Sequence, residues 1–236
     1  MPRMARTEGF FTAATFDFLR QLTANNRKDW FDANKTTYEQ QVKAPALAFI
    51  AAAGPRLTRI SQEIVADPRP VGGSLMRVYR DIRFSKDKTP YKTNVGISFG
   101  HRQARDTAAP GYYLHLGLDR QWGNFSGGGI HMADTTTLRA IRDAIVEDSA
   151  AWKKAAHNTK VASTHTFGDD ALKRVPPGYP AEHPFADDLR RKGFFAHVRY
   201  TQAEVTAHDF LDRFIENCRM EAPMLAFLAN AVGASW

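Results

Sequence analysis

Two stretches in the middle of the chain alternate strictly between apolar and polar or small residues. Val95, Ile97 and Phe99 share one side of the first stretch, and residues 112–118 repeat the pattern. A period of two is typical of a strand with one buried and one polar face, as in an antiparallel sheet. We therefore predict two half-buried strands, joined by a hydrophilic hairpin loop at residues 101–110. Shorter strands are predicted at residues 75–80, 123–128 and 194–200.

Helical patterns precede these strands. Thr12 is placed to cap a first helix, and a second helix is expected to begin near Arg27. Pro45 suits the first turn of a third helix, because proline is tolerated where the backbone N–H has no helical partner. We expect this helix to run to about Ile64, with a disturbance at residues 54–55.

Further helical patterns follow the strands. Asp134 is placed to cap a helix whose apolar stripe reaches Trp152, and residues 201–204 form a capping box that opens another helix. Pro223 is expected to restart a last helix that ends near Gly233.

The order of these elements predicts the fold class. Residues 157–184 contain four prolines, too many for one helix or central strand, so we expect an irregular segment there. Helices, strands, a helix, this segment, a strand and closing helices favour an α+β fold with a mostly antiparallel sheet and N-terminal and C-terminal helices packed around it. We expect a single domain over residues 1–236, helical at 10–65, sheet-rich at 75–130 and mixed at 134–233.

Several classes of protein are disfavoured by the composition. The single cysteine, Cys218, excludes an internal disulfide and a multi-cysteine zinc site, and we expect it to be a buried thiol. The histidines show no metal-binding spacing, so we expect neither a metal nor a cofactor. The longest apolar run, residues 44–54, is too short to span a membrane, and residues 1–7 lack a signal-peptide pattern. We expect a cytoplasmic protein without a membrane partner.

Residues 77–94 concentrate the positive charge of the chain. Six cations and two acids give this segment a net charge of +4, more than half of the chain's +7. So many N–H donors favour an anionic ligand, such as a phosphate group. Because the six cations cannot all serve one ligand, we expect Arg77 or Arg80 to pair with Asp81 or Asp87 while the loop cations face outward. The alternative is a solvated loop braced by Arg–Asp pairs. The predicted ligand-binding residues are Arg77, Arg80, Arg83, Lys86, Lys88 and Lys92.

A second basic group lies within residues 173–192. It could complete the same cleft from the other side if the irregular segment folds over the sheet. Tyr179 and His183 suit a pocket wall better than solvent, whereas an ordinary polar surface is the alternative. The group consists of Lys173, Arg174, Arg190, Arg191 and Lys192, and its predicted ligand-binding residues are Lys173, Arg174 and Tyr179.

Polar residues also follow the predicted strands at spacings of two or four. Such spacing puts the members of each pair on one face of their strand. If the strands adjoin in register, the pairs form a hydrogen-bonding floor beneath the cationic loop. His115 is then the candidate general acid or base, because an imidazole titrates near neutral pH. A covered sheet face with satisfied histidines is the alternative. The pairs are Asn94 with Ser98, Tyr113 with His115, Asn124 with Ser126, and the predicted ligand-binding residues His197 with Arg199.

Two short motifs are weaker evidence of function. Ser85 and Lys88 match Ser-x-x-Lys, but the accompanying motifs of serine acyl-transfer enzymes are missing. Residues 127–129 are three consecutive glycines that could cradle an anion before the helix capped by Asp134, although a tight turn or close packing is the simpler interpretation.

Several motifs resemble a known family. The run at residues 80–93 is similar to the signature of the family catalogued as domain of unknown function 2461, a conserved hypothetical protein, and the resemblance covers nearly the whole chain. It implies membership of a family but no reaction and no catalytic residue. The further matching motifs are residues 25–31, 111–115, 127–129, 172–174, 177–179 and 183–184.

Three functions are compatible with these patterns. The first is binding of a phosphorylated or other anionic small ligand in a basic cleft between residues 80–92 and 173–192. The second is a nucleic-acid-binding module, suggested by aromatic residues among the cations, although the basic residues cluster in two loops rather than along a helix. The third is a noncatalytic scaffold with internal salt bridges. Whether a reaction follows binding is left open by the sequence.

Overall fold

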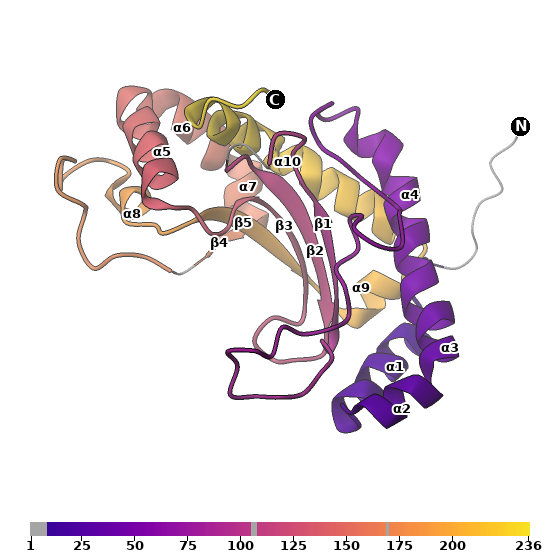
Figure 1. Cartoon of the computed structure of the whole chain (residues 1–236). Helices are drawn as coiled ribbons and strands as arrows, with labels where there is room; N and C mark the ends of the chain where they lie inside the picture. Colours follow the sequence, from indigo (N-terminus) through magenta and orange to yellow (C-terminus); the bar gives the residue numbers. More distant parts are fainter. Residues whose placement is uncertain (1–8, 105–107, 169) are drawn as a thin grey trace, which may run out of the picture.

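An antiparallel sheet lies at the centre of the molecule (Figure 1). The computed structural model describes residues 9–104, 108–168 and 170–236. The strand order is β1-β2-β3-β5-β4, and every neighbouring pair is antiparallel. The fold is therefore α+β, as the order of the sequence patterns predicts. The strands are β1 (Asn94–Phe99), β2 (Gly111–Gly117), β3 (Asn124–Ile130), β4 (Thr166–Phe167) and β5 (Phe194–Tyr200).

The N-terminal part of the described chain is helical. Thr12 is the N-cap of the first helix, as predicted, and the flanking Phe11 and Phe16 are fully buried. A π-helical turn, η1, joins the second and third short helices to a longer one. The elements are α1 (Ala13–Ala24), α2 (Lys28–Ala33), α3 (Lys35–Tyr38), η1 (Glu39–Lys43) and α4 (Ala44–Leu57).

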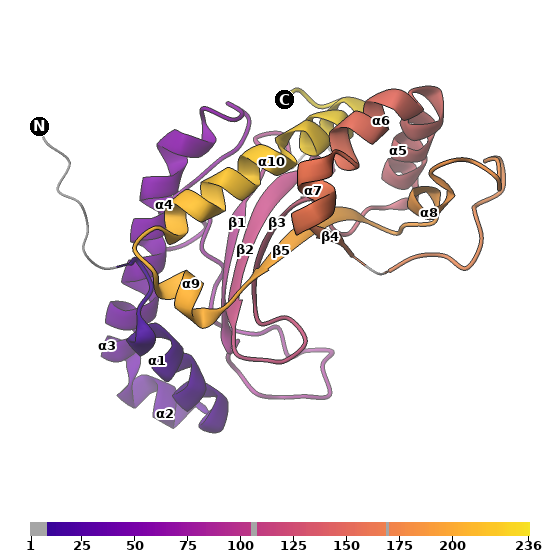
Figure 2. The ribbon, with the colours of Figure 1, turned by 180° about the vertical axis from the view of Figure 1, so that it is seen from behind.

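One long helix covers one face of the sheet. α10 (Phe210–Ala231) lies across this face in Figure 2, preceded by the short α9 (Gln202–Thr206), which the predicted capping box opens. The Tyr112 hydroxyl donates to the Cys218 carbonyl at 2.8 Å, and the Asn217 amide donates to the Tyr200 hydroxyl at 2.6 Å. These bonds fix the helix on strands β2 and β5. Cys218 itself is a buried free thiol, as expected.

Four helices connect the sheet to its last long strand. Asp134 caps the first of them, as predicted, by accepting from the Thr137 amide at 2.7 Å. The described part of residues 157–184 holds one short helix, and β4 follows it before an irregular stretch. The helices are α5 (Thr135–Glu147), α6 (Ser149–Ala156), α7 (Thr159–Thr164) and α8 (Ala186–Leu189).

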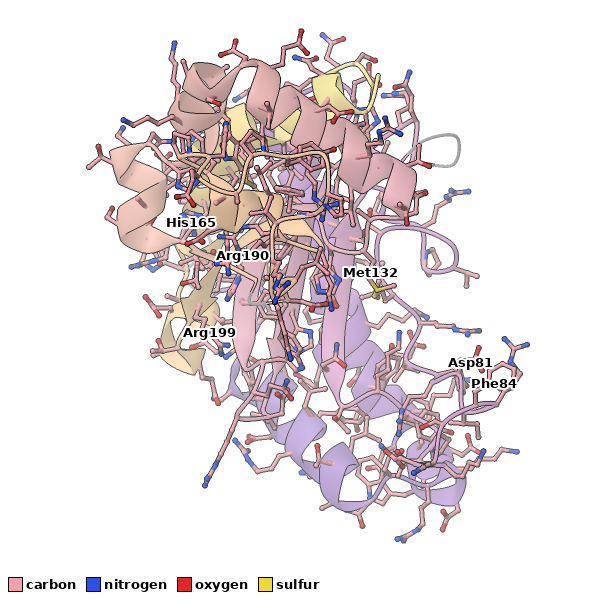
Figure 3. All side chains as sticks on the ribbon, turned by 90° about the vertical axis from the view of Figure 1, so that its left-hand side faces the viewer. Asp81, Phe84, Met132, His165, Arg190 and Arg199 are labelled. Carbon is pink, nitrogen blue, oxygen red and sulfur yellow. The ribbon has the colours of Figure 1, made fainter. Side chains whose placement is uncertain are left out.

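The described helices cover little of the opposite face of the sheet (Figure 3). Figure 3 looks at this face, and the described helices leave much of the central strands uncovered there. We call it the open face: the side of the sheet away from α10. None of the described helices combines the length and the apolar character of a membrane-spanning helix.

The predicted strand at residues 75–80 is wrong. Isolated bridges join Leu75 to β1 and Tyr79 to Tyr91. Because the segment pairs first with β1 and then with residues 90–92, it keeps no continuous ladder with either partner. Part of the predicted hairpin loop, residues 105–107, lies outside the described residues.

Three helix predictions are also wrong. α4 ends at Leu57 rather than near Ile64. The helix expected to follow residue 134 without interruption divides at Asp148, whose side chain accepts from the Ala151 amide and so caps a second helix. Pro223 lies inside α10 and does not restart a helix. The buried apolar stripe on both sides of this proline outweighs the loss of one helical hydrogen bond.

Candidate ligand site on the open face of the sheet

Strand register defines which side chains share the open face. Residues directly opposite one another on antiparallel strands point to the same side of the sheet. Two rows therefore cross the sheet, and they contain five of the predicted polar residues. The first row is Ser98, Tyr113, Gly127 and His197, and the second is Gly96, His115, Phe125 and Arg199.

The predicted hydrogen-bonding floor is wrong in its β3 residues, Asn124 and Ser126. Asn124 and Ser126 lie on the other side of the strand from Phe125 and Gly127, so they face α10 rather than the open face. The Ser126 hydroxyl is 2.6 Å from the Tyr200 hydroxyl, within the network that holds this helix. The open face consequently carries an aromatic ring and a glycine where hydrogen-bonding side chains are predicted.

His115 lies on β2, between Gly96 and Phe125 in the second row of the open face. Its ring stacks on Phe125 with 5.1 Å between centroids and 9° between planes, and its Nδ1 is 3.5 Å from the Asn94 amide nitrogen. Its Nε2 is buried and has no hydrogen-bond partner among the described residues. Burial lowers the pKa of His115, and the nearby Asp119 carboxylate opposes that effect only in part. The imidazole is therefore mostly neutral at pH 7 and able to accept a proton.

Arg199 and His197 lie at the β5 side of the open face. The Arg199 guanidinium donates to the carbonyls of Gln121 at 2.9 Å and Trp122 at 3.2 Å. It thus holds the turn between β2 and β3 in place. His197 contacts Phe125 through its ring, with centroids 5.8 Å apart.

The cationic segment contains internal ion pairs. Arg80 binds Asp87 at 2.5 Å, in agreement with the predicted internal pairing, and also contacts Thr89. Arg83, predicted to face outward, is bound to Asp81 at 2.7 Å while its side chain remains 76% exposed. The pKa of Asp87 falls to about 2, chiefly because the Thr89 amide donates to it and then because of Arg80. These two arginines carry their own counter-ions.

The other cations of the segment differ in their surroundings. Lys88 donates to the Ile82 carbonyl at 2.9 Å and has no ion pair with an acid among the described residues. Arg77, Lys86 and Lys92 have no hydrogen bond or ion pair from their side chains to the rest of the described chain.

Lys92 is the least solvated of these cations. Burial lowers its pKa, and the like charge of Arg77 lowers it further. Lys92 lies two residues before Asn94, which begins β1 and belongs to the open face. A partly desolvated cation beside a second cation favours a bound anion, because an anion relieves both penalties.

The second basic group is largely neutralised by neighbouring aspartates. Arg190 binds Asp187 at 2.5 Å, and Lys192 binds Asp170 at 2.8 Å. Arg191 binds the buried Asp188, also at 2.8 Å. Lys173 and Arg174 are exposed and have no ion pair within the described part of the chain.

Tyr179 fixes the irregular segment to α5. Its hydroxyl donates to the Asp143 carboxylate at 2.7 Å. The predicted wall residue His183 is instead 3.0 Å from the Ser149 hydroxyl. Among the described residues no hydrogen bond or ion pair joins residues 77–92 to residues 173–192, although both segments extend on the same side of the sheet in Figures 1 and 2.

Sequence reasoning missed the aromatic residues of the open face. Trp122, Phe125 and Phe195 were not among the predicted site residues. One signal could have identified Phe195: it alternates with a period of two with His197 and Arg199, so the three residues lie on the same face of β5. The glycine-rich β3 has no apolar alternation, so the sequence does not show which of its residues face α10 and which lie on the open face.

The structure and its comparisons define the class of the protein. It is an α+β protein with one open face of a five-stranded antiparallel sheet, and the described residues contain no cluster of three or more potential metal ligands. The chain belongs to the family described as conserved hypothetical protein DUF2461, whose model matches residues 14–227. No curated protein and no solved structure shows a significant match to the chain.

Proposed function

We propose that the protein binds a phosphorylated small ligand on the open face, with its anionic group at the β1 edge. The observation that carries this proposal is Lys92, a cation that burial and Arg77 both destabilise and that has no carboxylate partner among the described residues. Asn94, two residues after Lys92, and His115, which Asn94 contacts, offer neutral hydrogen-bonding groups on the open face. A phosphate group suits this combination of cations and neutral donors.

The other predicted ligand-binding residues differ in how directly they would act on the ligand in this proposal. Lys86 and Lys88 lie on the same exposed segment as Arg77 and Lys92 and add positive potential there. Lys173 and Arg174 would contact a ligand long enough to cross the open face. Arg80 and Arg83 act on the loop through their aspartates rather than on the ligand. Within this proposal His115 is the candidate for proton transfer, because its neutral imidazole contacts Asn94, which lies two residues after Lys92.

Isothermal titration calorimetry tests the proposal. The full-length protein is titrated with inorganic phosphate, pyrophosphate, ribose 5-phosphate and glycerol 3-phosphate. Substitution Lys92→Met keeps the apolar stem and removes the charge. We expect it to weaken binding about tenfold, since a charge-assisted hydrogen bond contributes roughly 1.5 kcal/mol or more.

Lys154→Met, on α6, removes an exposed lysine from another part of the molecule and is the matched control. We expect it to leave the affinity unchanged. Absence of binding by all four compounds, or equal effects of the two substitutions, contradicts the proposal.

A further inference from the structure

The open face carries a connected layer of aromatic rings. Phe125 is at its centre and is 8% exposed, because other rings surround it. The neighbouring centroids lie 5.1–6.5 Å from that of Phe125, within the range of favourable ring contacts. The surrounding rings are Tyr113, His115, Trp122, Phe195 and His197.

Glycines beneath the layer allow the rings to lie against the backbone. A Cβ atom on Gly127 would come within 2.6 Å of the Phe195 ring. A Cβ atom on Gly96 would come within 2.7 Å of the Tyr113 hydroxyl, and one on Gly117 would lie 2.9 Å from the His115 Nε2. Each ring thus occupies space that the side chain of any other residue at these glycine positions would fill. The rings therefore pack close to the strand backbone, and their faces and edges form the surface of the layer.

Trp122 is the exposed ring of this layer. It is 45% exposed, although a solvent-facing tryptophan is costly. Two hydrogen bonds hold its backbone: the backbone N–H donates to the Asp119 carboxylate at 2.6 Å, and the backbone carbonyl accepts from the Arg199 guanidinium. A fixed, half-exposed indole is suited to stacking against a second planar ring.

We propose that the ligand's other end is a planar base, so that the ligand is a free nucleotide. This inference rests on the phosphate binding proposed above. The base would lie on the ring layer beside Trp122, and the phosphate would lie near Lys92 and Arg77. An open antiparallel sheet with aromatic rings on its face is a known arrangement for holding bases.

The distribution of charge favours a free nucleotide over a nucleic-acid strand. A strand requires a continuous basic track along its backbone. Here the predicted ligand-binding cations without an ion pair in the described chain are Arg77, Lys86, Lys88 and Lys92 in one segment and Lys173 and Arg174 in another, and Arg199 between them is bound to backbone carbonyls. Arginines between and around them are mostly bound to aspartates.

Calorimetry with AMP, UMP, ribose 5-phosphate and adenosine tests this inference. We expect both nucleotides to bind about tenfold more tightly than ribose 5-phosphate, because stacking of one base on an aromatic side chain contributes on that order. Trp122→Ala should bring the affinity for AMP close to that for ribose 5-phosphate, and leave the latter within about twofold. Phe84→Ala removes a ring that is 94% exposed and lies outside the layer, and should change neither affinity.

The outcomes separate the two proposals. Equal affinities for AMP and ribose 5-phosphate, or equal effects of Trp122→Ala and Phe84→Ala, overturn the nucleotide inference while phosphate binding stands. No binding of AMP, UMP or ribose 5-phosphate overturns both proposals. Binding of a single-stranded oligonucleotide with a steep salt dependence, without binding of AMP or UMP, overturns the free nucleotide in favour of a nucleic acid.

Discussion

Glu221 and His165 face each other inside the molecule, with 3.1 Å between the carboxylate Oε1 and the imidazole Nε2 and with both side chains buried. The two atoms do not form a hydrogen bond of regular geometry. Burial raises the pKa of Glu221 to about 7, and the proximity of His165 opposes this only in part. A carboxyl group that resists ionisation therefore lies between α10 and the sheet.

The raised pKa of Glu221 predicts a pH-dependent stability. The folded chain holds this proton more tightly than the unfolded chain, where the carboxyl has its usual pKa of 4.5. The protonated carboxyl therefore contributes most to stability below pH 4.5, and the contribution is lost as the pH rises from 4.5 towards 7. Glu221→Gln should increase the free energy of unfolding at pH 8 relative to the wild type, by an amount on the order of 2 kcal/mol, and increase it less at pH 5.

Urea unfolding at the two pH values measures this difference. Glu216→Gln, which changes an exposed glutamate on the same helix, should produce an equal and small change at both. A Glu221→Gln effect that does not vary between pH 5 and pH 8 would contradict the raised pKa.

Gly128 leaves room for the Glu221 carboxylate. A Cβ atom at this position would lie 2.8 Å from the Glu221 Oε2 and 2.8 Å from a methyl carbon of Leu225. We expect Gly128→Ala to lower the free energy of unfolding by about 1–3 kcal/mol through overpacking. Gly100→Ala is the control, because nothing lies within 4 Å of its Cβ position. Thermal unfolding of both variants checks this, and similar melting temperatures would count against close packing at Gly128.

Asp188 joins α6, the segment after it and α8. Its carboxylate accepts from the Trp152 indole at 2.7 Å, His157 at 2.6 Å and Arg191 at 2.8 Å. Burial acts to raise the pKa of Asp188, but the three donors outweigh it and the pKa is lowered. The resulting stabilisation is present above pH 3.8 and is lost as the pH falls through the lower, folded-state pKa.

Asp188→Asn should therefore cost about 3 kcal/mol at pH 7, since it leaves buried donors without a charged acceptor. Asp187→Asn is a matched control one residue earlier, where the side chain is 84% exposed, and it should change stability by less than about 0.5 kcal/mol. Chemical denaturation followed by tryptophan fluorescence compares the two. Equal stabilities would show that the buried carboxylate contributes nothing.

The titration of His115 offers a direct test of the electrostatics on the open face. Burial lowers its pKa and Asp119 raises it, with a net lowering from 6.5. We expect an NMR titration midpoint below 6.5, and a still lower one in Asp119→Asn. A midpoint at or above 6.5 in the wild type, or an upward shift in the variant, would disagree with the described surroundings of His115.

Much of the fold could be predicted because local signals were strong. The strand at Phe194–Tyr200 has the predicted bounds, and the caps at Asp134 and Thr201 lie where their side chains can accept backbone N–H groups. Alternation also located β1 and β2 to within one or two residues. In each case a short stretch of sequence contains the physical cause of the structure.

The errors arose where distant contacts decide the structure. Pro223 is a local helix breaker, yet packing of α10 against the sheet keeps the helix continuous. β3 is buried on both faces, so its sequence carries no alternation that could show which way Asn124 and Ser126 point. The cationic run around Arg80 was visible in the sequence, but its division into paired and unpaired charges depends on the folded positions of the aspartates.

Backbone NMR of the protein during titration with ribose 5-phosphate tests the central claim most directly, because it locates the bound phosphate compound. The account predicts that the largest amide shift changes fall at Arg77, Lys92, Asn94 and His115, and that Lys92→Met removes them. Changes confined to α10 or α6, or no changes at millimolar ligand, would contradict binding at the β1 edge of the open face.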